Sequence, residues 1–228
     1  MSKSLKNVIN PDEMIAQYGA DSCRMYEMFM GPLDMSKPWN TQGLIGIFRF
    51  LEKIWGIAGK ELTLCPVNDT STPEHAEITK LLNKTIKKIT EDTASLNFNT
   101  AISQMMIFIN ALGKYNSVPR FAWEAFIKLL APYAPHLAEE LWEKLGYMET
   151  IAYAQWPMYV EKFCIDSECT IVVQINGKVR DKFQAAIDLP KDELEAIALK
   201  TDGAQRFLGD KPPKKVIVVR NKLINIVI

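Results

Sequence analysis

The first four residues, Met1-Ser2-Lys3-Ser4, are the part of the sequence that most directly suggests chemistry. Lys3 supplies an ammonium group, and the two serines supply hydroxyl donors. A short loop that carries such groups can neutralise the charge that builds on phosphate oxygens when a phosphate bond breaks. A Ser/Lys loop before a helix is more often plain solvated chain, so these four residues alone favour that simpler interpretation.

A second group of candidate residues is basic and lies near the C-terminal end. Residues 170–228 contain eleven Lys and Arg against seven Asp and Glu, a net charge of +4 in a chain of net charge zero. Clustered cations can contact phosphate and ribose. The alternatives are scattered surface lysines, or lysines that protect an edge strand against aggregation. The candidates are Lys178, Arg180, Lys182, Lys214, Lys215, Arg220 and Lys222.

Potential metal ligands are sparse. Among four cysteines only Cys164 and Cys169 are close in sequence, and no histidine or second cysteine pair completes a zinc set with them. His136, in the first turn of an expected helix, is interpreted as a structural residue. We therefore expect no metal site, and free, largely buried thiols in a reducing compartment. The other residues of these types are Cys23, Cys65 and His75.

Helix signals dominate the first two-thirds of the sequence. Apolar residues recur at spacings of three and four, the period of an amphipathic helix. Asn10 can cap the first helix, whose first position suits Pro11, and Gly19 marks a break before a second helix. From residue 41 to about 146 we expect an all-helical bundle with short links. The expected helices are 11–18, 21–30, 41–60, 73–90, 98–115, 118–131 and 135–145.

The periodicity changes near residue 170. Asn176-Gly177 is a strong signal for a two-residue hairpin between flanking strands. On the second of these strands, Lys178, Arg180 and Lys182 are expected to share one face. The region is predicted to be a small α+β domain. Its elements are strands at 170–175 and 178–183, a helix at 190–200, a short helical piece at 204–208, and strands at 214–220 and 223–228.

The opening residues resemble the last four of the Lys-Met-Ser-Lys-Ser signature of class I aminoacyl-tRNA synthetases, with the first Lys absent because the chain begins after it. Similar residues follow in the expected order along essentially the whole chain. They are Asn7-Val8-Ile9-Asn10-Pro11, Tyr18-Gly19-Ala20-Asp21 with Arg24, Gly31-Pro32, Trp39, Arg49-Phe50-Leu51 with Trp55, the stretch from Leu130 to Trp142, and Ala154-Gln155-Trp156-Pro157.

The tail is similar to the compact C-terminal domain of bacterial-type leucyl-tRNA synthetases, which contacts the outer corner of the L-shaped tRNA. The resemblance lies in residues 173–182 and 214–228. The valine enzyme typically ends in a coiled coil and the isoleucine enzyme in zinc-binding cysteines, and the sequence has neither heptads nor such a cysteine set. A valyl-, isoleucyl- or methionyl-tRNA synthetase, or a stand-alone RNA-binding module, remains the alternative.

The resemblance implies three parts: the end of a catalytic region (1–38), an anticodon-binding-like helical bundle (39–160) and a small α+β domain (168–228). The expected fold class is mainly α, with that bundle followed by the α+β domain. Met1, Ser2, Lys3 and Ser4 would form an ATP-binding loop in which Lys3 acts in catalysis, and the seven basic residues would contact tRNA.

The full-length parent would join leucine to tRNA(Leu) with ATP and Mg²⁺. The 228-residue chain alone, which lacks the other ATP signature, is expected to be inactive and to need no cofactor. No signal peptide is visible, and no apolar run is long enough for a membrane span. We therefore expect a cytoplasmic protein without a membrane partner, and a monomer.

Overall fold

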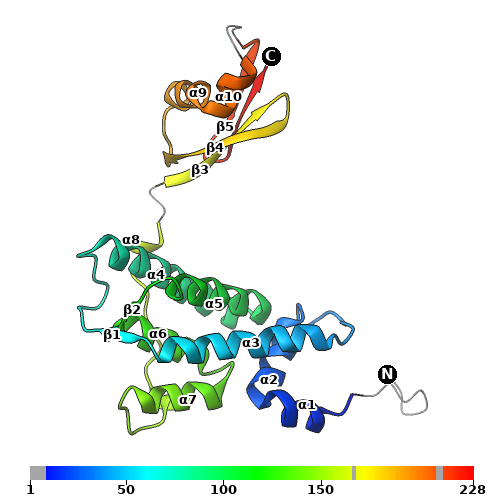
Figure 1. The fold of residues 1–228 in the computed structure, drawn as a ribbon, viewed down its shortest axis with the longest axis vertical. Coiled ribbons are helices and arrows are strands. Elements are labelled where there is room, and N and C mark those ends of the chain that lie inside the picture. The colour runs from blue at the N-terminus through cyan, green and yellow to red at the C-terminus, as the bar shows by residue number, and fades with distance from the viewer. Residues whose placement is uncertain (1–8, 166–167, 209–212) are drawn as a thin grey trace. The chain divides into compact units, whose positions relative to one another are not determined.

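The computed structural model describes residues 9–165, 168–208 and 213–228, which form two compact units (Figure 1). The first unit is Met1–Cys164 and the second is Ile165–Ile228. Each unit has a hydrophobic core of its own. The fold confirms the predicted class, because a mainly helical part precedes a small α+β part.

The first unit consists of helices and one pair of short strands. The predicted helices are present, with ends that differ by a few residues. In chain order the elements are α1 (Pro11–Tyr18), α2 (Ala20–Phe29), α3 (Thr41–Ala58), β1 (Glu61–Thr63), α4 (Pro73–Ala94), α5 (Phe98–Leu112), β2 (Ser117–Pro119), α6 (Arg120–Leu130), α7 (Pro135–Lys144), the 3-10 turn η2 (Ile151–Tyr153) and α8 (Glu161–Cys164).

Local signals explain the first two helices. The Asn10 side chain accepts a hydrogen bond from the backbone N–H of Asp12 (3.2 Å), which caps α1 as predicted. Gly19 separates α1 from α2 with a φ of 84°, a conformation that favours glycine. The break predicted at this glycine is therefore confirmed.

The helices of the first unit share one core. Met25 and Tyr26 of α2 are buried together with the apolar faces of α3, α4, α5 and α6. In Figure 1, α4 and α5 lie side by side in this bundle. No break between cores occurs near residue 38, so the functional boundary expected there stays a prediction.

A buried carboxylate joins α2 to α7. Asp21, which is 8% exposed, accepts hydrogen bonds from Nδ1 of His136 (2.7 Å) and from the backbone N–H of Leu137 (2.8 Å). Leu137 lies in the first turn of α7, so Asp21 caps that helix from a distant part of the chain. Arg24 adds a hydrogen bond to the carbonyl of Pro132 (3.2 Å). His136 is thus structural, as expected, and its partner is the side chain of Asp21.

Replacing Asp21 by alanine is expected to lower the free energy of unfolding of the first unit by about 2–3 kcal/mol. A hydrogen bond to a charged group is worth about 1.5–3 kcal/mol and a helix cap about 1 kcal/mol. Urea unfolding followed by tryptophan fluorescence measures this, because all five tryptophans lie in the first unit. In the control His136→Gln, the altered side chain is 78% exposed in the parent, so the loss should stay below about 1 kcal/mol. Equal losses would contradict the capping role.

The short parallel pair of β1 and β2 was not predicted. Helices were expected to reach Lys60 and to start at Val118, but α3 ends at Ala58 and α6 starts at Arg120. Val118 precedes Pro119, and a residue before proline is disfavoured in the helical conformation. Lys60 serves another purpose, because its Nζ donates to carbonyl oxygens just beyond the end of α5, including that of Gly113 (2.9 Å).

The second unit is a four-stranded sheet with two helices. Its strands lie in the order β4-β3-β6-β5, where β3 and β6 are parallel and the two outer pairs are antiparallel. Both helices contribute buried side chains to the core against one face of the sheet. The elements are β3 (Glu168–Ile175), β4 (Lys178–Ala186), α9 (Lys191–Lys200), α10 (Asp202–Leu208), β5 (Lys215–Val219) and β6 (Leu223–Val227).

The turn between β3 and β4 confirms the predicted hairpin. Asn176 and Gly177 have φ values of 48° and 79°. Two consecutive positive φ angles are typical of a type I′ turn, whose twist matches that of the flanking strands. The parallel pairing of β3 with β6 was not predicted, since it joins segments about fifty residues apart.

A carboxylate on β4 caps α10. Asp181 accepts hydrogen bonds from the backbone N–H of Gly203 (2.8 Å) and from that of Lys182 (2.8 Å). These bonds, the one from Gly203 first, hold the pKa of Asp181 below its usual range. A Cβ at position 203 would lie 2.5 Å from the carbonyl oxygen of Arg180, so the close approach of helix and strand requires glycine.

Replacing Asp181 by asparagine is expected to destabilise the second unit at neutral pH. Because the pKa of Asp181 is lower in the folded chain, its contribution is complete above the unfolded value of about 3.9 and is lost as the pH falls through the folded value. Thermal unfolding followed by far-ultraviolet circular dichroism should show a lower Tm for the variant than for the parent chain at pH 7. This difference in Tm should become smaller below about pH 4. Tryptophan fluorescence should not change, because all five tryptophans lie in the first unit. A difference in Tm that did not depend on pH would contradict a role for the Asp181 carboxylate.

Candidate nucleic-acid interface

The phosphate-binding loop expected at Met1, Ser2, Lys3 and Ser4 lies outside the described residues. Its assignment therefore stays a prediction. The seven predicted tRNA-contacting cations all lie in the second unit and all are described.

All seven of these basic residues are exposed. Between described residues of the second unit, the ion pair formed is that of Lys191 with Glu195 on α9, which includes none of the seven. Cations without a carboxylate partner can exchange their counterions for phosphate groups. The exposed positions therefore meet the first requirement for contact with a polyanion.

A β-bulge interrupts the pairing of β3 with β4. Val173 pairs with Asp181, whereas the next residue, Gln174, pairs with Val179. Arg180 is therefore the extra residue of the bulge. The bulge reverses the alternation of side chains along β4.

The prediction that Lys178, Arg180 and Lys182 share one face is wrong because of this bulge. Lys178 pairs with Ile175, whose side chain is buried on the helix-covered face. Lys182 pairs with Val172 on the opposite, open face, since paired residues project to the same side. A simple period of two could not reveal an inserted residue.

Arg180 is held against a helix. Its guanidinium lies 4.1 Å from the ring centroid of Phe207 on α10, a cation–π contact that leaves its donors exposed. Arginine in this arrangement can still bind phosphate, because stacking occupies the face of the guanidinium and hydrogen bonding its edge.

The remaining cations lie at opposite ends of the sheet. Lys178, Lys214 and Lys215 are at the end where β3 and β6 finish, since Lys215 pairs with Val227. Arg220 and Lys222 are in or next to the β5–β6 turn at the other end. The seven residues therefore surround the sheet and do not form one patch.

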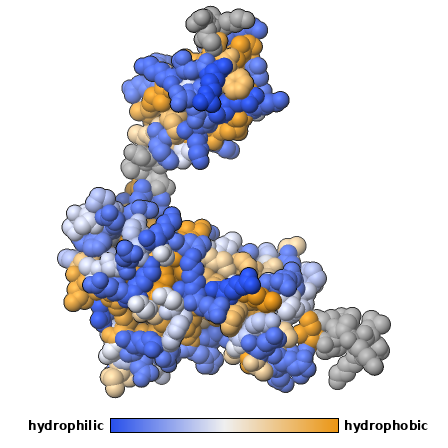
Figure 2. Space-filling view, viewed as in Figure 1, coloured by the Kyte–Doolittle hydropathy of each residue, from blue (hydrophilic) through white to orange (hydrophobic). Residues whose placement is uncertain are grey.

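The open face of the sheet combines cations with aliphatic side chains. Lys182 and Lys215 lie on this face, and the exposed side chains of Ile217 and Val219 alternate onto it along β5. Figure 2 shows hydrophobic residues exposed among hydrophilic ones on the second unit. Ammonium groups spaced by aliphatic side chains can contact a sugar–phosphate backbone without reading bases.

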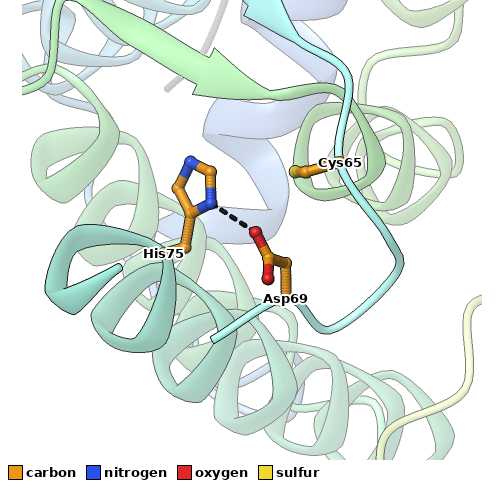
Figure 3. Close-up of side chains that lie close together, drawn as sticks. All are labelled: Cys65, Asp69 and His75. Carbon is orange, nitrogen blue, oxygen red and sulfur yellow. Dashed lines mark hydrogen bonds and ion pairs between the residues drawn. The ribbon is translucent and has the colours of Figure 1, made fainter. Parts of the chain in front are cut away.

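The first unit contains a cluster that the sequence did not predict. Cys65, Asp69 and His75, in and beside the loop before α4, bring a thiol, a carboxylate oxygen and a ring nitrogen within 4.8 Å of one another (Figure 3). The sequence predicted no metal ligands, because among the cysteines only Cys164 and Cys169 are close together. The three residues lie in one short stretch of the sequence, with three and five residues between them, but this spacing matches no known metal-binding motif.

All four cysteines are free and partly buried, less deeply than expected. Burial raises the pKa of the Cys23, Cys65 and Cys164 thiols. Thiols with a raised pKa are poor nucleophiles, which argues against a catalytic role for these three.

Comparison with known proteins identifies the family. A family model described as the anticodon-binding domain of tRNA ligase matches residues 75–196, which is more than half of the chain. The chain belongs to this family. The match begins in α4 and continues into α9 of the second unit.

Several leucine–tRNA ligases are similar to this chain over its whole length. Those of Treponema pallidum subsp. pallidum, Borreliella afzelii and Borrelia turicatae are 53%, 52% and 53% identical to it. The chain is covered completely but spans only 28%, 26% and 26% of their lengths. The predicted resemblance to leucyl-tRNA synthetases is confirmed, and the other synthetases and a stand-alone module are not favoured.

A solved structure supports the same assignment. The chain matches a LeuRS of Agrobacterium radiobacter K84 (agnB2) in a ternary complex with tRNA and LeuAMS, with a TM-score of 0.74 and 28% identity. The match covers 100% of this chain and 31% of that one. Within the described residues, no helix is both long and apolar enough to cross a membrane.

Proposed function

We propose that this chain is the tRNA-holding part of a leucine–tRNA ligase. The observation that carries the proposal is the identity of 52–53% with leucine–tRNA ligases along the entire chain, together with the anticodon-binding family match. The full-length parent joins leucine to tRNA(Leu) through an adenylate made from ATP and Mg²⁺. Its location is cytoplasmic, and it acts as a monomer.

The chain alone does not activate leucine. It spans about a quarter of the length of its relatives, and the described residues form a helical bundle and a small α+β unit. Among the residues that the structure describes, neither unit has the parallel sheet with flanking helices on which nucleotide sites are commonly built. We expect no ATP–pyrophosphate exchange by the isolated chain, and measurable exchange would contradict this assignment.

Exposed apolar residues in the N-terminal segment support the proposal that the chain is part of a larger protein. Ile15, Leu33 and Met35 expose their side chains, and all three lie within 40 residues of the proposed phosphate-binding loop. Exposed large apolar side chains of this kind are common at interaction surfaces. We propose that the catalytic part of the parent packs against this segment, which brings Lys3 to the ATP phosphates.

The two units divide the work of holding tRNA. We propose that the second unit contributes a diffuse electrostatic contact, because its basic residues surround the sheet and lack carboxylate partners among the described residues. Such contacts give affinity that falls steeply with salt and carry little sequence information. The helical bundle then supplies the shape that a particular tRNA fits.

Replacing Lys182 and Lys215 together by glutamine tests the electrostatic contact. We expect the slope of log K against log[salt] for tRNA(Leu) to fall by about 1–2, since each lost phosphate contact removes about 0.7–0.9 from the slope. Filter binding at several salt concentrations measures it. The matched control is Lys191→Gln, an ion-paired lysine on α9, which should leave the slope unchanged. Equal slopes for the double variant and the parent chain would show that the open face of the sheet does not contact tRNA.

A further inference from the structure

The loop that connects β1 to α4 gathers three potential metal ligands. Cys65 lies just after β1, Asp69 lies in the middle of the loop and His75 lies in the first turn of α4. Figure 3 shows the Asp69 carboxylate between the ring of His75 and the side chain of Cys65. The side chains of His75 and Asp69 are 17% and 11% exposed, so both are largely covered by their neighbours while water still reaches them.

Hydrogen bonds outside the three ligand atoms hold this loop in place. The backbone N–H of His75 donates to the side chain of Thr72 (3.1 Å), which fixes the start of α4. The hydroxyl of Thr79 donates to the backbone carbonyl of Asp69 (2.7 Å). Asn83 donates to the side chain of Asn68 (2.8 Å). The ligand positions are therefore fixed by neighbouring residues, which lowers the cost of ordering them around an ion.

Thiolate, imidazole and carboxylate together form a donor set that Zn²⁺ accepts. Zinc takes four ligands in tetrahedral arrangement, from sulfur at about 2.3 Å and from nitrogen and oxygen at about 2.0–2.2 Å. Harder ions such as Mg²⁺ and Ca²⁺ prefer oxygen ligands alone. We propose that Cys65, Asp69 and His75 bind one Zn²⁺ ion, with a water molecule as the fourth ligand.

The metal-free geometry fits this proposal with small movements. Nδ1 of His75 donates to Oδ2 of Asp69 at 2.6 Å, so one proton occupies the place between two ligand atoms. Zinc would replace this proton and that of the Cys65 thiol. The neutral imidazole of His75 would then carry its proton on Nε2, and the thiol proton passes to solvent. Two ligand atoms about 2.0 Å from a tetrahedral ion lie about 3.3 Å apart, so this pair must separate by about 0.7 Å.

Cys65 is free to complete the site. Its Sγ makes only a weak hydrogen bond, to the carbonyl oxygen of Thr63 at 3.8 Å. A tetrahedral zinc site requires the sulfur to lie about 3.5 Å from the nitrogen and oxygen ligands, so the sulfur moves inward by at most about 1.3 Å from the 4.8 Å limit of the cluster.

Zinc at this position would cross-link the loop to α4. Binding to the folded state alone stabilises that state, so saturating zinc should raise the Tm of the first unit. The stabilisation is independent of tRNA, which separates this proposal from the proposed function.

Titration calorimetry with the chelator-treated full chain tests the proposal. We expect one Zn²⁺ per chain, and at least about tenfold weaker binding by the variants Cys65→Ser and His75→Gln. The matched controls are Cys164→Ser and His136→Gln, which change the same residue types elsewhere and should bind as the parent does. Tryptophan fluorescence checks that each variant folds.

Cobalt substitution supplies a second readout on the unaltered chain. Co²⁺ should give tetrahedral d–d bands and a thiolate-to-cobalt charge-transfer band, and Zn²⁺ should abolish both. The charge-transfer band should be lost in Cys65→Ser and kept in Cys164→Ser. No binding of either ion, unchanged zinc binding by Cys65→Ser, or cobalt binding without the charge-transfer band would each overturn the proposal and leave a loop held by hydrogen bonds alone.

Discussion

Replacing Lys3 by alanine in the full-length parent is expected to lower the rate of ATP–pyrophosphate exchange by about 10²–10³-fold. Adenylate formation displaces pyrophosphate, and charge builds on the leaving phosphates in the transition state. Loss of one well-placed donor to such charge typically costs a factor of that size. The effect should fall on kcat more than on the KM for leucine, because the ammonium group acts where charge develops.

The matched control for this substitution is Lys6→Ala, three residues further along the chain. Lys6 lies outside the resemblance to the signature, so its loss should change the exchange rate by less than about threefold. Binding of tRNA(Leu) should be unaffected in both variants. If Lys3→Ala and Lys6→Ala reduced exchange equally, Lys3 would have no special role in the loop.

Replacing Trp123 by alanine is expected to destabilise the first unit by about 3–5 kcal/mol. Trp123 on α6 is 1% exposed, and its ring stacks on that of Phe126 at 5.8 Å. Phe126 in turn stacks on Phe108 of α5 at 5.6 Å. Removal of the indole therefore leaves a cavity in the core of the first unit and breaks this aromatic series. The surrounding side chains cannot fill the cavity without moving.

Urea unfolding followed by fluorescence of the remaining tryptophans measures this loss. Trp55 on α3 is the matched control, because it is 44% exposed and its main described partner is Lys144, 4.8 Å from the ring centroid. Trp55→Ala should cost less than about 1 kcal/mol. A loss at Trp123 as small as that at Trp55 would contradict the placement of Trp123 in the core of the first unit.

Most of the fold was predictable because local signals and the global fold agree. The Asn10 cap, the break at Gly19 and the Asn176-Gly177 hairpin each depend on the conformation of one or two residues, and each is present. The bundle was predictable because its apolar residues repeat with the helical period along α3 to α7.

Features that depend on distant partners could not be predicted. The parallel pairs β1–β2 and β3–β6 join segments more than 45 residues apart, and nothing in either segment specifies the other. The sequence around Asp21 suggests a cap for its own helix, but Gly19 is the N-cap of α2, and Asp21 caps α7 more than 100 residues away. Tertiary contacts of this kind are decided by packing and leave no periodic signal.

The candidate site was predictable in composition but not in arrangement. The residue types and their exposure could be predicted from the basic composition of the tail. The bulge at Arg180, which places Lys178 and Lys182 on opposite faces of the sheet, could not. The cluster of Cys65, Asp69 and His75 was missed because its members follow no known metal-binding spacing. Such a site depends on how one loop folds back onto α4.

The most direct test of the central claim is the binding of tRNA(Leu) by the isolated chain. Filter binding of labelled tRNA(Leu) at a low and a high salt concentration measures the affinity. Competition by unlabelled tRNA(Leu) and by an unrelated tRNA measures the selectivity. We expect weak binding that falls steeply with salt. Unlabelled tRNA(Leu) should displace bound tRNA(Leu) at a lower concentration than the unrelated tRNA does. Absence of binding at low salt, or equal competition by both tRNAs, would contradict a role for this chain in holding tRNA(Leu).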